Sequence, residues 1–185
     1  MVTDVHAFAM MVAKSAKPVA GFATGNCCSA AYWIASQCGE LAADPTAVIG
    51  SIGICMSGDY QVEPDSEGEM EVTIVSSNAP NKRPDLSTEE GQALIRATLD
   101  DMEAVFLADV ARGRRTTTAT VKSDFGAGGT MTGRAALAAG MIDRVEANGL
   151  PDMIARLARG ARAATPRRAA AVNSLKALQA SIASL

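Results

Sequence analysis

The hydrophobic pattern of the first third of the chain switches between helical and strand spacing. A helix is predicted over residues 2–16, where one apolar face is formed by Val5, Phe8, Ala9 and Val12. Pro18 disfavours helix in the residue before it, and the short apolar run that follows predicts a strand. Gly25 and Asn26 supply turn residues, and the Ala-rich run 29–36 has an apolar helical face. The pattern therefore predicts a strand, a tight turn and a helix that begins at Ser29.

The rest of the chain continues this alternation of strands and helices. Short strands are predicted at 41–43, 71–76 and 141–145, with an acidic loop at 57–70. Residues 48–56 are expected to be a glycine-interrupted segment whose backbone passes close to another part of the chain. The longest helix is predicted over 88–113, and residues 116–129 are expected to be an irregular polar connection. Shorter helices are expected at 133–140 and 150–163. This order indicates an α/β fold with one domain over residues 1–160, followed by an Ala-rich helical or flexible tail at 161–185.

Composition narrows the class of protein. With 185 residues, 48% of them apolar, the chain can bury a substantial core, and a net charge of −3 gives no reason to expect nucleic acid as a partner. No apolar stretch reaches the length of a membrane span. The four cysteines form no CxxC pattern, which favours reduced thiols, a cytoplasmic location and no metal site. The Gly50–Gly53 stretch lacks phosphate-loop spacing, so no cofactor is expected.

Three polar residues are candidates for chemistry, although each has a simpler explanation. Ser29 opens a helix, where a hydroxyl lies near the positive end of the helix dipole and can serve as a nucleophile or merely as an N-cap. Ser51 could be catalytic or satisfy local backbone groups, and Lys82 alone is typical of a solvated surface lysine. The only histidine, His6, lies on the first predicted helix, which argues against a Ser-His-Asp triad.

Taken together, these segments resemble the signal peptide peptidase A family of Ser-Lys peptidases, and most closely its phage and prophage capsid assembly members. The resemblance covers about residues 5–158. It depends on an ordered series of short motifs: Lys17-Pro18-Val19, Cys28-Ser29-Ala30-Ala31-Tyr32, Asp44-Pro45, Gly50-Ser51-Ile52-Gly53, Gly133-Arg134-Ala135 and Gly140-Met141-Ile142-Asp143.

The resemblance implies a role for each candidate residue. Ser29 matches the family's nucleophile, Lys82 its general base, and Ser51 the serine that helps to position that base. A lysine can accept the serine proton only when it is neutral, a state that burial and neighbouring cations favour. Arg83 could not replace it, because a guanidinium does not lose its proton. The loop before Lys82 lacks the glycine usual in the family, so the register of the base could differ by a residue or two.

The resemblance also implies a crotonase/Clp-like superfold, a polypeptide substrate and a homo-oligomeric ring in which neighbouring subunits complete the site. Family members place a strand and a Gly-rich turn ahead of the first helix, and this chain is expected to lack both. Capsid or scaffold proteins are the expected partners, in a bacterial cytoplasm or a phage prohead. Two alternatives remain open: an inactive structural relative in capsid assembly, and an acyl-CoA hydratase-like enzyme, which would need paired carboxylates that do not stand out here.

Overall fold

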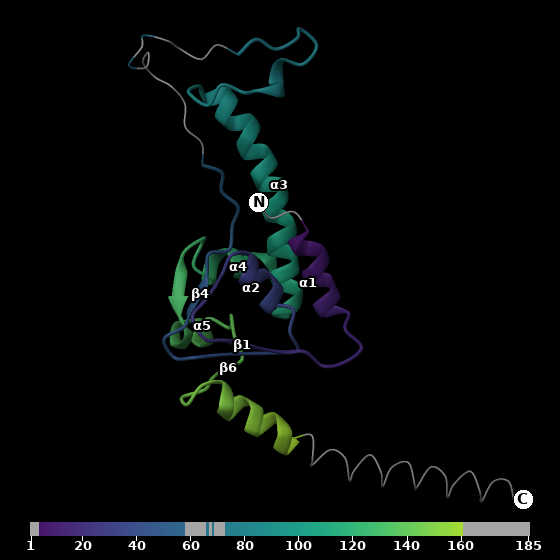
Figure 1. The fold of residues 1–185 in the computed structure, drawn as a ribbon, viewed down its shortest axis with the longest axis vertical. Coiled ribbons are helices and arrows are strands. Elements are labelled where there is room, and N and C mark those ends of the chain that lie inside the picture. Colours follow the sequence, from purple (N-terminus) through teal and green to yellow (C-terminus); the bar gives the residue numbers. More distant parts are fainter. Residues whose placement is uncertain (1–3, 58–65, 67, 69–72, 161–185) are drawn as a thin grey trace, which may run out of the picture.

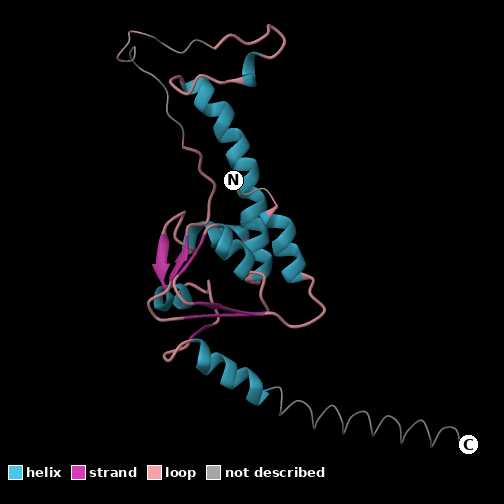
Figure 2. Cartoon of the chain, viewed as in Figure 1, coloured by secondary structure: helices cyan, strands magenta, loops and turns pink. Residues whose placement is uncertain are grey.

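The computed structural model describes residues 4–57, 66, 68 and 73–160. It contains two small sheets with helices packed against them (Figures 1 and 2). The first sheet has the order β1-β3-β6, from β1 (Ala20–Ala23), β3 (Glu40–Ala43) and β6 (Arg144–Val145), and all its pairs are parallel. The second has the order β2-β4-β5, from β2 (Asn26–Cys28), β4 (Val48–Gly50) and β5 (Thr130–Thr132). In it β2 and β4 are parallel, whereas β4 and β5 are antiparallel. The predicted α/β class is therefore confirmed, with two sheets.

The helices of the body are α1 (Val5–Ala13), α2 (Ala30–Ala35), α4 (Thr118–Asp124), α5 (Gly133–Ala138) and part of α3 (Glu89–Gly113). Residues 150–160 form a further helix beyond β6. Large side chains from several of these elements are fully buried in the core, among them Tyr32, Leu41, Ile49, Phe106 and Phe125. Trp33 of α2 stacks on Phe106 of α3 with ring centroids 4.3 Å apart. Burial of this aromatic surface stabilises the packing of α2 against α3.

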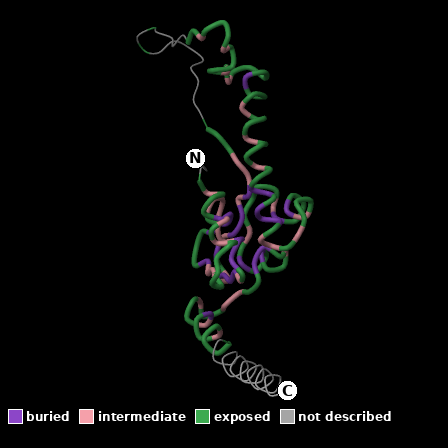
Figure 3. Tube along the Cα trace, turned by 90° about the vertical axis from the view of Figure 1, so that its right-hand side faces the viewer, coloured by how far each residue is buried: buried purple, intermediate pink, exposed green. Residues whose placement is uncertain are grey.

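The helix α3 is only partly inside this core. Its C-terminal half contributes Phe106, Leu107, Val110 and Ala111 to the buried set, whereas Gly91 is the only buried residue before Phe106. Figure 3 shows the difference as a purple centre with a largely green projection. The first half of α3 stands away from the sheets, and residues 73–88 lie at its outer end, together with the one-turn helix η1 (Pro80–Lys82) (Figure 1).

The structure corrects four local predictions. Residues 26–28 form strand β2, where the sequence favoured a turn. The polar segment 116–129 contains α4, which Thr117 caps and which buries Val121 and Phe125. Thr130–Thr132 adds the unpredicted strand β5. The strand predicted at 71–76 is absent from its described part, residues 73–76, where Ile74 is 91% exposed and pairs with no sheet. The predicted tail at 161–185 lies outside the described residues.

Candidate active site

Ser29 connects the end of β2 to the start of α2. Its backbone has φ 53° and ψ −124°, a conformation that glycine adopts easily and that costs other residues about 1–3 kcal/mol. Its N–H donates to the carbonyl of Gly50 at 2.9 Å. Its hydroxyl makes no capping hydrogen bond to α2, so the simple N-cap explanation fails. A strained strand-to-helix turn is the local geometry that presents a nucleophilic serine in many hydrolases.

Ser51 lies beside Ser29 because of the strand register. In the parallel pair β2–β4, Cys28 is opposite Gly50, and Ser29 and Ser51 are the next residues along each strand. Ser51 has the same φ of 53° as Ser29, and its N–H donates to the carbonyl of Gly129 at 2.8 Å. Two hydroxyl residues therefore leave neighbouring carboxyl ends of parallel strands, the usual place for sites in α/β proteins.

Gly50 allows this arrangement by its lack of a side chain. Its φ is 129°, and a Cβ built on it would come within 2.6 Å of the Gly129 carbonyl oxygen. Any larger residue would push β5 away from β4. The glycine-rich connection 126–129 therefore packs directly against the backbone that carries Ser51.

Lys82 lies far from this pair within one chain. It is the last residue of η1 and is exposed, and its segment lies at the outer end of α3, away from the sheets (Figure 1). The structure therefore brings Ser29 and Ser51 together but does not bring Lys82 to them. A general base must lie within hydrogen-bond reach of the hydroxyl that it deprotonates, so Lys82 could act on Ser29 only if a further contact brought the two residues together.

Neighbouring thiols are poor competitors for the role of nucleophile. Burial raises the pKa of the Cys27 thiol to about 11, and burial also raises the pKa of Cys28, the residue before Ser29. Thiols with raised pKa values carry little thiolate at neutral pH. Among the described residues, no group of three or more His, Cys, Asp or Glu side chains could hold a metal ion. The arrangement thus favours an oxygen nucleophile.

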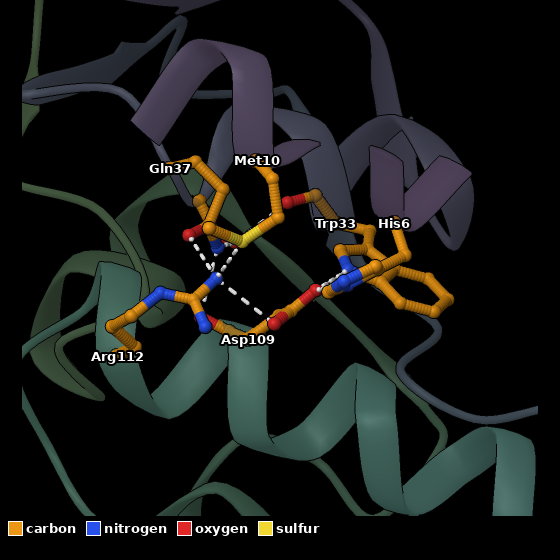
Figure 4. Close-up of polar contacts among 7 residues, drawn as sticks. His6, Met10, Trp33, Gln37, Asp109 and Arg112 are labelled. Carbon is orange, nitrogen blue, oxygen red and sulfur yellow. Dashed lines mark hydrogen bonds and ion pairs between the residues drawn. The ribbon is translucent and has the colours of Figure 1, made fainter. Parts of the chain in front are cut away.

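The only histidine is also accounted for. His6 extends from α1 and bonds through Nδ1 to Oδ2 of Asp109 on α3, at 2.6 Å (Figure 4). Asp109 also binds Trp33 and Arg112, which sequence reasoning did not detect, because these residues come from three separate helices. In the described part of the chain, neither the His6 ring nor the Asp109 carboxylate hydrogen-bonds to a serine, threonine or cysteine side chain, which argues against a Ser-His-Asp triad there.

Comparison with known proteins decides the family. The sequence profile of Peptidase family S49 matches residues 12–164, most of the chain. The chain belongs to peptidase family S49. A Synechocystis sp. protein named "Putative protease slr0021" is 27% identical over 146 residues, which is 77% of this chain and 52% of that protein. The chain thus spans about half the length of this relative. S49 membership confirms the predicted family of serine peptidases, while the capsid branch stays a prediction.

Within this S49 chain, the matched region includes both serines and Lys82. None of the helices in the described part of the chain is long and apolar enough to cross a membrane.

Proposed function

We propose that this chain is a serine endopeptidase in which Ser29 is the nucleophile, Lys82 the general base and Ser51 the residue that orients the base. The observation that supports this most is the strained Ser29 turn, whose hydroxyl caps nothing and which lies beside Ser51 through the β2–β4 register. Strain at a polar residue at the end of a strand is typical of functional positions.

In this mechanism the neutral amine of Lys82 removes the proton from the Ser29 hydroxyl while its oxygen attacks the scissile carbonyl carbon. The tetrahedral intermediate collapses, the C–N bond breaks, and the leaving amine takes the proton back from the lysine. Water then attacks the acyl-enzyme, again giving its proton to Lys82, and the acid product leaves with Ser29 restored. Ser51 orients the Lys82 amine toward Ser29 through a hydrogen bond between its own hydroxyl and that amine.

The distance between Lys82 and the sheets supports a site shared between two copies of the chain. The part of α3 before Phe106 exposes apolar side chains that a single copy leaves uncovered: Leu94, Met102 and Val105. A second copy packed along this part would cover them. It would also bring the segment that carries Lys82 to the Ser29 turn of its neighbour and bury the amine. We propose the homo-oligomeric ring on this basis.

The first experiment tests the nucleophile. A fluorophosphonate probe should label the chain, and Ser29→Ala should abolish the labelling. Ser57→Ala is the matched control, because Ser57 is an exposed serine outside the strained turns, and it should be labelled like the wild type. A chain that refolds normally but is not labelled would favour the alternative of an inactive structural relative.

The second experiment tests the shared site. Ser29→Ala and Lys82→Met should each be inactive alone. If the dyad spans two copies, mixing them should restore about a quarter of the wild-type activity by random assembly of closed oligomers. Absence of recovery, in mixtures whose subunits demonstrably exchange, would mean that serine and lysine come from one chain.

The substrate and setting follow from the resemblance. We propose a polypeptide substrate among capsid or scaffold proteins, cleaved in a bacterial cytoplasm or a prohead. Incubation with a purified scaffolding protein should give discrete fragments that disappear with Ser29→Ala. General degradation of casein without cleavage of scaffold would argue for a broader peptidase.

A further inference from the structure

One buried carboxylate connects the three helices behind the nucleophile. Asp109 of α3 is only 2% exposed. Its Oδ2 accepts from Trp33 Nε1 of α2 at 2.8 Å and from His6 Nδ1 of α1 at 2.6 Å (Figure 4). Its Oδ1 pairs with Arg112 Nη2 at 2.9 Å. Every oxygen of this side chain is therefore engaged, as a buried charge requires.

A second layer of contacts fixes the C-terminal end of α2. The amide of Gln37 donates to the backbone carbonyl of Asp109 at 2.8 Å and accepts from Arg112 at 3.1 Å. It also donates to the Ser36 hydroxyl, which in turn donates to the carbonyl of Trp33. Ser36 is completely buried, and Gln37 is 6% exposed. The C-terminal end of α2 and the residues that follow it therefore bind α3 through both the side chain and the backbone carbonyl of Asp109.

These contacts reach Ser29 through a single helical hydrogen bond. The N–H of Trp33 donates to the carbonyl of Ser29 at 2.9 Å, so the residue bound by Asp109 also hydrogen-bonds to the backbone of the proposed nucleophile. With only six residues, α2 is too short to hold its own geometry and depends on tertiary contacts. A rotation or shift of α2 would release the strained Ser29 backbone.

We propose that Asp109 is a positioning residue for the nucleophile: by binding Trp33 with its carboxylate and Gln37 with its carbonyl, it holds α2 in the orientation that keeps Ser29 in its strained turn. This inference depends on the proposed function of Ser29. It assigns Asp109 no contact with substrate. A buried ion pair adds little net stability, because the cost of removing its charges from water offsets the attraction between them. The cluster around Asp109 is therefore better explained by the orientation that it imposes on α2.

The test compares the rate at which a fluorophosphonate probe labels Ser29 in matched variants. Trp33→Phe keeps an aromatic ring on Phe106 and removes only the Nε1 donor, so it should fold and be labelled about 10-fold more slowly, with KM for a peptide substrate nearly unchanged. Asp109→Ala should be slower by about 100-fold, and Asp109→Asn, which keeps an acceptor for Trp33, should lie between wild type and Asp109→Ala.

Asp143→Asn is the control. Asp143 is a carboxylate that binds Arg114 and the N–H of Leu41, and the residues that it binds include no partner of Asp109. Its loss should lower the melting temperature while leaving the labelling rate within about 2-fold of wild type, because it does not hold Trp33 or Gln37. All rates are measured well below the melting temperature of the least stable variant.

The outcomes separate the inference from the proposed function. A wild-type chain that is not labelled at Ser29 overturns both. Labelling of Trp33→Phe and Asp109→Asn at the wild-type rate, in a chain that does label at Ser29, overturns the positioning role alone. Equal slowing in Asp143→Asn also overturns it, because the effect would then be general loss of stability.

Discussion

The two halves of α3 differ in almost every physical respect. The C-terminal half is packed against α2, with Asp109 and four apolar residues buried and its polar groups paired. The N-terminal half projects from the body, exposes apolar side chains and leads from the segment that carries Lys82 (Figures 1 and 3). One helix thus fixes the proposed nucleophile at one end and presents an uncovered surface at the other.

This difference shows which part of the proposed dyad is preset. The geometry of Ser29 is built into the monomer by strand register, core packing and the Asp109 cluster. The environment of Lys82 is not, because nothing in the described part of one chain brings it to Ser29. We therefore expect changes at the packed end to alter stability and Ser29 reactivity, and changes at the projecting end to alter activity without altering stability.

The largest effect is expected for Lys82→Met. Loss of a general base lowers turnover by about 100- to 10,000-fold, and Lys82→Arg should be as inactive because a guanidinium stays charged. Both variants should melt like the wild type, since Lys82 is exposed. Peptide cleavage and thermal unfolding are measured in parallel. Near-normal turnover of Lys82→Arg would show that another group acts as the base.

The next prediction compares two tight glycines of α3. A Cβ on Gly91 would lie 1.9 Å from the Asp85 carbonyl oxygen, and one on Gly113 would lie 2.2 Å from that of Ser36. The distance is shorter at Gly91, but the atoms in the way there belong to the projecting loop, which can shift without disturbing the core. Gly113→Ala presses on the buried end of α2 and should cost about 1–3 kcal/mol of unfolding free energy. Gly91→Ala should leave the melting temperature nearly unchanged; a larger loss there would mean that the projecting end is part of the cooperative core.

Local patterns predicted the helices better than the site. The capping residues of α3 gave its bounds to within one residue, because these signals are contained in the segment itself. The face spacing of the first helix gave its place but not its ends: residues 2–16 were predicted, and α1 is Val5–Ala13. By contrast β2 was missed, since Asn26 follows a glycine and the strand has three residues. The Thr-rich α4 was missed because its stability comes from burying Val121 and Phe125, which local propensity does not record.

The contacts that build the site could not be predicted from local sequence patterns either, because they join residues that are distant along the chain. Ser29 and Ser51 are neighbours through parallel strand pairing, and His6 meets Asp109 across most of the chain. Neither pairing leaves a spacing signal in the sequence. The combined roles of Ser29, Ser51 and Lys82 were inferred from the resemblance to the signal peptide peptidase A family. Membership of family S49 supports this resemblance but does not test the role of any single residue.

The next prediction concerns the loss of thermal stability at acidic pH, and the expected effect is smaller. Burial raises the pKa of the Asp109 carboxyl, but hydrogen bonds from Trp33, His6 and Arg112 outweigh it, so the net pKa is lowered; the same direction holds for Asp143, where bonds from Arg114 and Leu41 outweigh burial. A lowered carboxyl pKa stabilises the folded state above the unfolded value of about 4, and this stability is lost as the pH falls further. The melting temperature should therefore drop between about pH 5 and pH 3.

Asp109→Asn removes one of the carboxyls that contribute to this dependence. Its melting temperature should be lower than that of the wild type at pH 7 but should change less between pH 5 and pH 3. Calorimetry at several pH values measures both slopes. The contacts of Asp109 favour its ionised form in the folded state. If the melting temperatures of the two proteins fell equally with pH, that expectation would be wrong.

The smallest effect compares two helix caps of the same type. Thr88 accepts the N–H of Gly91 at the projecting start of α3, and Thr117 accepts the N–H of Thr120 at the start of α4, inside the body. Replacing such a threonine by alanine typically costs about 1 kcal/mol. For Thr117→Ala this cost should appear in global unfolding, because α4 packs Val121 and Phe125 into the core. For Thr88→Ala it should appear only as faster amide hydrogen exchange in the first turns of α3, because an unpacked helix end frays without unfolding the rest. Equal losses of melting temperature would mean that the two halves of α3 unfold as one unit.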